Sequence, residues 1–279
     1  MNLIVQGKTV STPSLEALAT LAAAAAIETV SATAFRLTGA DDSQRAEIAA
    51  YCDAHALDCG WVPAERRIRD FGLLVMDMDS TLITIECIDE IADMHGLKPQ
   101  VSAITEAAMR GEIDFAESLR RRVSLLSGLD QSALQRVYDE RLQLSPGAEA
   151  LLAAARTAGI KTLLVSGGFT FFTERLQSRL GLDYTAANSL EVAGGKLTGR
   201  VLGDIVDAQG KADWLNRVRA GLNLARSQVI AMGDGANDLK MMAEAALSIA
   251  YHAKPVVRAQ ASHALNQVGL DGVIPLLGG

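Results

Sequence analysis

The sequence predicts an α/β protein whose main domain is a doubly wound, mostly parallel sheet, with an inserted helical cap and a small α/β domain in front. Three segments share one form, an apolar run that ends in small or acidic residues. They are LLVMDMDST from Leu73, KTLLVSGGF from Lys161 and QVIAMGDGAND from Gln228. Helix-like stretches such as GAEALLAAARTAG separate them, and strands that alternate with helices are typical of parallel sheets. Because ligands bind beyond the carboxyl ends of such strands, the three ends should meet at one crevice.

The first 70 residues alternate short strand-like and helix-like pieces, which predict the small α/β domain. The expected order is a strand at 2–7, a helix at 14–27, one strand at 29–37, a helix at 42–57 and a strand at 59–62. The charged stretch AERRIRD then separates domain 1–70 from domain 71–279. The small domain resembles the ACT-like regulatory domains of amino-acid enzymes, although it is one strand short of their βαββαβ order. A dimer contact or a simple scaffold therefore competes with ligand binding there.

Two insertions interrupt the alternation in the main domain. Residues 85–144 have apolar positions at helical spacing, with breaks at Gly96, Gly111 and Gly128, and predict a helical bundle that could act as a lid. The stretch NSLEVAGGKLTGRVLG has β character on both sides of AGGK. It predicts a β-hairpin.

Composition excludes several classes of function. The formal net charge is −7 and no Lys/Arg-rich block is present, which argues against general nucleic-acid binding. Three cysteines, Cys52, Cys59 and Cys87, lack the spacing of a zinc site or a redox pair. The start of the chain has no secretory pattern, and the most apolar helical stretch, 17–27, is too short to span a bilayer. A cytoplasmic protein without a membrane contact is expected.

The first strand end carries two carboxylates, Asp77 and Asp79. A carboxylate in this position can attack an electrophilic phosphorus, and a second one can protonate the leaving oxygen and then activate water. Residues two apart on an extended chain point to one face, although a turn that begins at Met78 would aim them differently. Because the carboxylates repel one another and a phosphate, a divalent cation is expected, and oxygen ligands favour Mg²⁺.

The other strand ends complete this chemistry. GDGAND contributes Asp234 and Asp238, and VSGG contributes the Ser166 hydroxyl with glycine amides that suit phosphate oxygens. Lys211, after the hairpin, is a candidate cation for the same phosphate. Each motif alone is more often a turn, a cap or a surface group. Their joint occurrence after three strand-like runs favours a site.

Together, DMDST, VSGG with Lys211 downstream, and GDGAND resemble the motifs of the haloacid dehalogenase superfamily. Within the insertion, IECIDEIA and AAMRGEIDFAESLRRRVSLL extend the resemblance to members that act on phosphoserine. The resemblance covers roughly residues 71–277 and implies a Rossmannoid core. It also implies Mg²⁺-dependent hydrolysis of O-phospho-L-serine to L-serine and phosphate, the last step of serine biosynthesis, through an aspartyl phosphate.

The resemblance also implies a role for each matching residue. Asp77 would be the nucleophile and Asp79 the general acid and base. Mg²⁺ would be held by Asp77, the Asp79 carbonyl and Asp234, with Asp238 in support. The substrate-binding residues would be Ser166, Gly167 and Lys211 for the phosphoryl group, Asn237 near it, Glu86 for the ammonium, Arg122 for the carboxylate, and Met109 and Phe115 closing over the substrate. On physical grounds too, an amino-acid phosphate needs one acid and one base held apart, and arginine pairs a carboxylate bidentately.

Two alternatives stay open at this point. One is a related enzyme that acts on another small phosphomonoester or transfers the phosphoryl group to an acceptor such as homoserine. The other is a non-catalytic amino-acid sensor that binds its ligand through residues 1–70. In all three cases the expected partner is a small molecule, with a homodimer as a further expectation.

Overall fold

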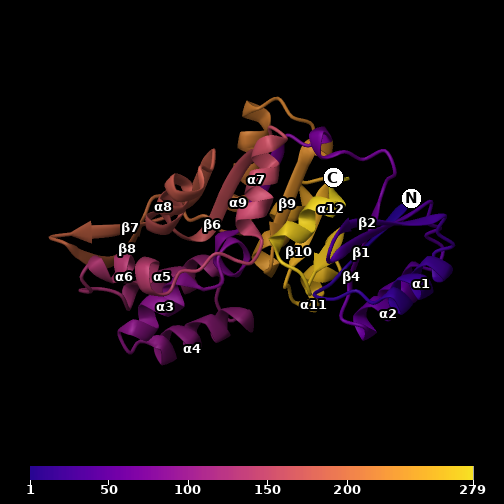
Figure 1. The fold of residues 1–279 in the computed structure, drawn as a ribbon. Coiled ribbons are helices and arrows are strands. Elements are labelled where there is room, and N and C mark those ends of the chain that lie inside the picture. The colour runs from indigo at the N-terminus through magenta and orange to yellow at the C-terminus, as the bar shows by residue number, and fades with distance from the viewer. Residues whose placement is uncertain (279) are drawn as a thin grey trace.

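The computed structural model describes residues 1–278, which form two sheets (Figure 1). The larger sheet has seven strands in the order β11-β10-β9-β5-β6-β7-β8. Every neighbouring pair is parallel except β7 and β8. The predicted mostly parallel sheet is therefore confirmed. Its strands are β5 (Leu73–Met76), β6 (Lys161–Phe169), β7 (Tyr184–Ala193), β8 (Lys196–Leu202), β9 (Val229–Gly233), β10 (Leu247–Tyr251) and β11 (His263–Leu265).

Helices cover both faces of this sheet, because successive residues of its central strands enter two different hydrophobic cores. Leu74 and Met76 of β5 belong to one core, whereas Leu73 and Val75 belong to the other. Burial of each such side chain stabilises the fold by roughly 1.5–3 kcal/mol. The first core includes residues of α7 (Ala148–Thr157), α8 (Thr170–Leu180) and α12 (Val273–Leu276). The second includes residues of α9 (Ala208–Gly221), α10 (Leu239–Ala243) and α11 (Pro255–Arg258).

Four of the helices between β5 and β6 form the cap, on the opposite side of the main sheet from the N-terminal domain (Figure 1). The three glycines expected to break the helical pattern do so, because Gly96, Gly111 and Gly128 have φ of 69°, 76° and 83°, which suits a residue without Cβ. Asp114 begins one helix, where its carboxylate accepts a hydrogen bond from the Glu117 amide at 2.7 Å. The helices are α3 (Cys87–Met94), α4 (Lys98–Met109), α5 (Phe115–Ser124) and α6 (Ser132–Glu140).

The predicted hairpin is present as β7 and β8, which pair in antiparallel fashion. Its turn is made by Gly194 and Gly195 at φ of 57° and 78°. Two consecutive positive φ angles match the twist of the flanking strands. The AGGK stretch is therefore the hairpin turn.

The small sheet shows that one prediction was wrong. Residues 29–37 are not one strand but parts of two, because the chain reverses at Ala32 and Thr33. The order is therefore βαββαβ, with the antiparallel strand order β2-β3-β1-β4, as in ferredoxin-like modules. The first helix also ends at Leu21 rather than 27, since Ala23 has φ of 44° and residues 26–27 already pair as a strand. The elements are β1 (Asn2–Gln6), α1 (Thr12–Leu21), β2 (Ala26–Ser31), β3 (Ala34–Thr38), α2 (Arg45–Ala54) and β4 (Asp58–Val62).

Buried polar contacts join this small domain to the C-terminal part of the main domain. The carboxylate of Asp58, which is 4% exposed, accepts hydrogen bonds from three backbone amides at 2.8–3.2 Å, those of Asn266, Gln267 and Val268. His263 Nε2 donates to the Trp61 carbonyl at 3.1 Å, and His263 Nδ1 is buried without a partner. Burial, reinforced by the charges of Arg66 and Arg45, lowers the pKa of His263 to about 4. The interface thus requires a neutral imidazole.

Acidification should therefore destabilise the protein through His263. The ring titrates near 6.5 in the unfolded chain and near 4 in the folded one, so the unfolded state binds the proton first. The free energy of unfolding should fall as pH drops from about 6.5 to about 4, with a loss of roughly 2 kcal/mol already at pH 5. Urea unfolding of the parent and of His263→Gln at pH 7 and pH 5 measures this. The variant should lose that part of the pH dependence, and identical pH dependence in both proteins would contradict the assignment.

Candidate active site

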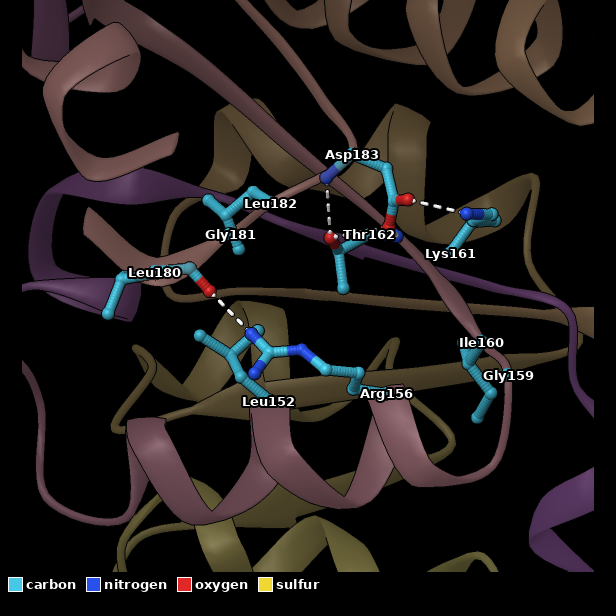
Figure 2. Close-up of a pocket in the computed structure, with 10 residues that line it drawn as sticks. All are labelled: Leu152, Arg156, Gly159, Ile160, Lys161, Thr162, Leu180, Gly181, Leu182 and Asp183. Atoms are coloured by element: carbon cyan, nitrogen blue, oxygen red, sulfur yellow. Dashed lines mark hydrogen bonds and ion pairs between the residues drawn. The ribbon is translucent and has the colours of Figure 1, made fainter. Parts of the chain in front are cut away.

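One cavity, of about 290 Å³, lies at the amino-terminal end of β6 and can be set aside (Figure 2). Its charged groups are already engaged, since Lys161 Nζ contacts Asp183 at 2.7 Å and Arg156 donates to the Leu180 carbonyl at 2.8 Å. Asp183 also accepts from the Thr162 amide and hydroxyl. These bonds tie two loops together, and the chemistry predicted from the sequence lies at the other end of the sheet.

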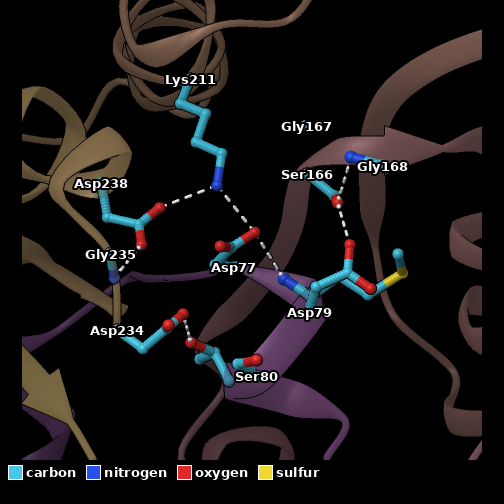
Figure 3. A network of polar contacts seen from close by, with 12 residues as sticks. Asp77, Asp79, Ser80, Ser166, Gly167, Gly168, Lys211, Asp234, Gly235 and Asp238 are labelled. Carbon is cyan, nitrogen blue, oxygen red and sulfur yellow. Dashed lines mark hydrogen bonds and ion pairs between the residues drawn. The ribbon is translucent and has the colours of Figure 1, made fainter. Parts of the chain in front are cut away.

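The chain turns sharply after β5, and this turn separates the two aspartates. Ser80 takes the left-handed conformation at φ 55°, which costs a residue with a Cβ on the order of 1 kcal/mol. Its amide donates to the Ile85 carbonyl and its hydroxyl to Glu86 Oε1 at 2.7 Å, which hold the turn. Met78, between the two aspartates, is already helical, so Asp77 and Asp79 point in different directions, as the alternative of a turn from Met78 allowed (Figure 3).

Asp77 is held by a buried cation (Figure 3). Its Oδ1 accepts hydrogen bonds at 2.7 Å from the Met78 amide and from Lys211 Nζ. Lys211, which is 1% exposed, also contacts Asp238 Oδ1 at 2.7 Å. Burial alone would lower the pKa of Lys211, but the charges of Asp238 and Asp77 outweigh it and raise that pKa. Lys211 thus remains a protonated donor between two carboxylates.

Three carboxylates gather at this point, and they could hold a metal ion. One oxygen each of Asp77, Asp234 and Asp238 lies within 4.8 Å of the others. Asp234 accepts from the Thr81 hydroxyl at 3.1 Å, so Thr81 orients it. Both oxygens of Asp238 are already engaged, by Lys211 and by the Gly235 amide at 3.0 Å. The side chain of Asp79 lies outside this set.

Asp79 instead faces the end of β6 and the cap. Its Oδ1 accepts from the Cys87 amide at 3.0 Å, and Ser166 Oγ lies 3.5 Å from its Oδ2. Gly168 must lack a side chain here, because a Cβ would come within 2.7 Å of Asp79 Oδ2. The second aspartate is therefore positioned by the first cap helix and by the VSGG motif together.

The environment of the site disfavours the ionised form of its carboxylates. Burial, followed by the charge of Asp238, raises the pKa of Asp77 and brings that of Asp234 to about 6. Burial also raises the pKa of Asp79. Lys211 offers a single positive charge among these groups. A cation bound by Asp77 and Asp234 would lower the pKa values of these two groups and relieve the repulsion.

The VSGG motif depends on a residue that the sequence analysis missed. Ser166 is buried and its Oγ accepts from the Gly168 amide at 2.8 Å. Asn188 of β7, which is 1% exposed, donates to the Gly167 carbonyl and accepts from the Val206 amide, both at 2.8 Å. A single asparagine in an ordinary strand sequence gives no sign of this role. It fixes the Gly167–Gly168 peptide unit of the motif.

The predicted cap residues differ in their burial and in the groups that surround them. Phe115 lies against the VSGG motif, since a Cβ on Gly167 would come within 2.8 Å of its ring. Arg122 is partly buried, and the charges of Asp89, Glu86 and Asp79 act on it. Glu86, at the start of α3, is exposed when its whole surface is considered. Its carboxyl group is nevertheless partly desolvated by nearby protein atoms, and this desolvation, followed by the charge of Asp79, raises its pKa to about 8.

Two predicted residues remain without a described contact to the site. Met109 at the end of α4 is 68% exposed, so its closing over a substrate stays a prediction. Asn237 is partly buried in the short 3₁₀ turn between Asp234 and Asp238. Its proximity to both acids keeps it near the site, and its role also stays a prediction.

Comparisons with known proteins place these features in context. Residues 74–243 match the family model of haloacid dehalogenase-like hydrolases, and residues 3–48 match a domain of unknown function, DUF4072. A phosphoserine phosphatase from Polaromonas sp. is 56% identical over 216 residues, which are 76% of this chain and 92% of the relative.

Solved structures agree with this. The unliganded crystal structure of a probable phosphoserine phosphatase from Vibrio cholerae has a TM-score of 0.87 and 39% identity, and the match covers 99% of this chain and 86% of the other. A substrate-bound phosphoserine phosphatase structure has a TM-score of 0.69 and 36% identity over 74% of this chain and 97% of its own. The first likeness therefore extends over both domains.

Replacement of Asn188 tests the support of the VSGG motif. Asn188→Ala should leave the Gly167 carbonyl and the Val206 amide buried without partners, and should lower the free energy of unfolding by about 2–4 kcal/mol. Ser189→Ala is the matched control on the same strand, because among residues 1–278 the Ser189 hydroxyl makes only a 3.4 Å contact, with the Thr170 hydroxyl. Urea unfolding of both variants decides the point. Similar losses in the two would show that the position is sensitive for another reason.

Proposed function

Because the chain belongs to the haloacid dehalogenase-like hydrolase family, as the resemblance implied, we propose that it hydrolyses O-phospho-L-serine to L-serine and phosphate. In metabolism this is the last step of serine biosynthesis. One observation carries the proposal: Asp77 stands at the strand end, bound through one oxygen by Lys211, while Asp79 is held separately beside Ser166. That arrangement suits transfer of a phosphoryl group to one carboxylate with proton transfer by the other.

The two oxygens of Asp77 would have different roles in this reaction. Oδ1 is bound by the Met78 amide and Lys211, so Oδ2 is the oxygen for attack on phosphorus. As the bond from phosphorus to the serine oxygen breaks, Asp79 gives its proton to that oxygen, and its raised pKa favours the protonated form. Asp79 then takes a proton from water, which attacks the aspartyl phosphate, releases phosphate and restores Asp77.

The donor set fits Mg²⁺, because it consists of carboxylate and carbonyl oxygens. Asp77, Asp234 and the Asp79 carbonyl would hold the ion. Asp238, whose oxygens are already bound to Lys211 and Gly235, would support it from behind. When bound, the ion supplies positive charge that offsets the carboxylates and the phosphate dianion. Ser166, the Gly167 amide and Lys211 would bind the phosphoryl oxygens, with Asn237 close by.

Specificity for an amino acid would come from the cap. Glu86 is the group for the substrate ammonium, and Arg122 the group for its carboxylate. Arg121 points elsewhere, since it pairs with Glu117 at 2.6 Å on the exposed side of α5. Phe115, which already contacts the VSGG motif, and Met109 would close over the substrate.

Further proposals concern the remainder of the chain. We propose residues 1–70 as an ACT-like regulatory or dimerisation domain, 71–279 as the phosphatase domain and about 85–144 as its cap. The βαββαβ order supports the first, and β2 offers an exposed edge to a second copy in a homodimer.

Free Cys52, Cys59 and Cys87 are compatible with the cytoplasm. Among residues 1–278, no helix is long and apolar enough to cross a membrane.

A substrate panel with phosphate release tests the proposed function. The parent enzyme with Mg²⁺ should prefer phosphoserine to phosphohomoserine, phosphothreonine and p-nitrophenyl phosphate. Asp77→Asn should lose at least about a thousandfold in kcat on all of them, because an amide is a poor nucleophile, and its far-ultraviolet circular dichroism should stay unchanged. Turnover by this variant at the parent rate would reject the covalent mechanism. A preference for another ester would reject the substrate, and amino-acid binding without turnover would favour a sensor.

Arg122→Ala tests how the substrate carboxylate is bound. Loss of one charged hydrogen-bonding partner costs on the order of 2–4 kcal/mol, or roughly thirtyfold to a thousandfold in kcat/KM for phosphoserine. The loss should be far smaller for p-nitrophenyl phosphate, which has no carboxylate. Arg121→Ala and Arg120→Ala, from the same helix, should stay near the parent on both substrates. Equal losses on both substrates for Arg122→Ala would mean that the arginine supports the fold or the phosphoryl subsite.

A further inference from the structure

We propose that the β7–β8 hairpin positions the carboxylate subsite, because Gly199 packs closely on the end of α5 and thereby holds Arg122 over the site. The proposal rests on the proposed function, in which Arg122 binds the substrate carboxylate. Gly199 touches neither substrate nor metal, so its role is to position another residue. Three sets of contacts support this role.

First, the hairpin is anchored in the main sheet beside the catalytic groups. β7 pairs in parallel with β6, the strand that carries Ser166 and Gly167. Asn188 of β7 is bonded to Gly167, as described above. The base of the hairpin therefore has a fixed relation to the phosphoryl subsite.

Second, the outer strand of the hairpin is hydrogen-bonded to the cap. The Gly128 amide donates to the Leu197 carbonyl, and the Leu197 amide donates to the Leu129 carbonyl, both at 2.8 Å. Ser127 Oγ donates to the Thr198 carbonyl at 3.2 Å. Leu197 is 2% exposed and belongs to the same hydrophobic core as the cap residues Leu119 and Val123. The segment that follows α5 is thus hydrogen-bonded along the outer edge of β8.

Third, Gly199 lies where no larger residue fits. A Cβ at this position would come within 2.9 Å of Ser127 Cβ and 3.2 Å of Ser124 Cα. Its φ is 80°, a conformation that glycine adopts readily. Ser124 is the last residue of α5 and lies two residues after Arg122. A shift of the helix end would therefore move the arginine with it.

The other end of α5 is also fixed, so the helix is supported at both ends. Phe115, its first residue, contacts the Gly167 position of the VSGG motif. Arg122 itself has little to hold it, since its Nε donates only to the Ser118 carbonyl of the same helix at 3.4 Å. Among the residues that the structure describes, no ion pair within 4 Å is formed by Arg122. The position of its guanidinium is therefore set by the helix as a whole.

The substitution Gly199→Ala tests the inference, and Gly203→Ala is its matched control. Gly203 also has positive φ, 71°, but a Cβ there would meet nothing within 4 Å. Both variants carry the strain of alanine at positive φ, and only the first pushes on the cap. Because a displacement of about 1 Å can cost about a hundredfold, Gly199→Ala should lose about tenfold to a hundredfold in kcat/KM on phosphoserine. It should change little on p-nitrophenyl phosphate, and Gly203→Ala should change little on either.

A second substitution shows whether the contact itself is responsible. Ser127→Gly removes the nearest cap atom, so the double variant Gly199→Ala/Ser127→Gly should regain part of the preference for phosphoserine. Rescue supports the positioning role. Equal losses of Gly199→Ala on both substrates, or no loss on phosphoserine, would overturn it. The parent protein is measured first: a parent without preference for phosphoserine would reject the proposed function and the positioning role with it, whereas a selective parent with an unaffected variant rejects the positioning role alone.

Discussion

The contact of Lys211 with Asp77 and Asp238 is the constraint on which the rest of the site depends. All three groups are almost fully buried, and both distances are 2.7 Å. Desolvation of each charge costs several kcal/mol, which only close partners offset, and loss of one partner in such a group typically costs 3–5 kcal/mol. The three residues come from the start of α9, the end of β5 and the turn after β9. The contact can therefore form only when three separate βα connections are in place.

This constraint also explains why the site could hold a cation. Asp77, Asp238 and Lys211 together carry one net negative charge when all are ionised, and Asp234 adds another within the same 4.8 Å cluster. A phosphate dianion would add two more. The lysine can neutralise only part of this charge, and its position on the side of Asp77 and Asp238 leaves Asp234 to other partners, of which Thr81 is one. The cluster is thus incomplete as a phosphate site until positive charge is added.

The sequence predicted the main sheet and the chemistry of its strand ends because both depend on local patterns. Buried parallel strands are apolar runs, and the groups that follow Met76, Val165 and Met232 are adjacent to them in the chain. What it could not predict depends on conformation or on distant contacts. The reversal at Ala32 and Thr33 uses neither Gly, Pro nor Asn, so it gave no turn pattern. The separation of Asp77 from Asp79 depends on the helical conformation of Met78 between them, and nothing in the apolar run before it marks that residue as the start of a turn.

The same contrast, between local sequence patterns and distant contacts, applies to the residues at the strand ends and the residues of the cap. Residues at strand ends can be predicted by motif because a strand end determines where they lie, whereas the positions of cap residues depend on how an inserted bundle packs. Phe115 packs against the VSGG motif, whereas Met109 is 68% exposed, although both lie in one predicted helical insertion. The segment that follows α5 is hydrogen-bonded to a hairpin some 70 residues later in the chain. Under the proposed function, recognition of the amino acid would be a property of two insertions acting together on the scaffold, while phosphoryl transfer would be a property of the scaffold itself.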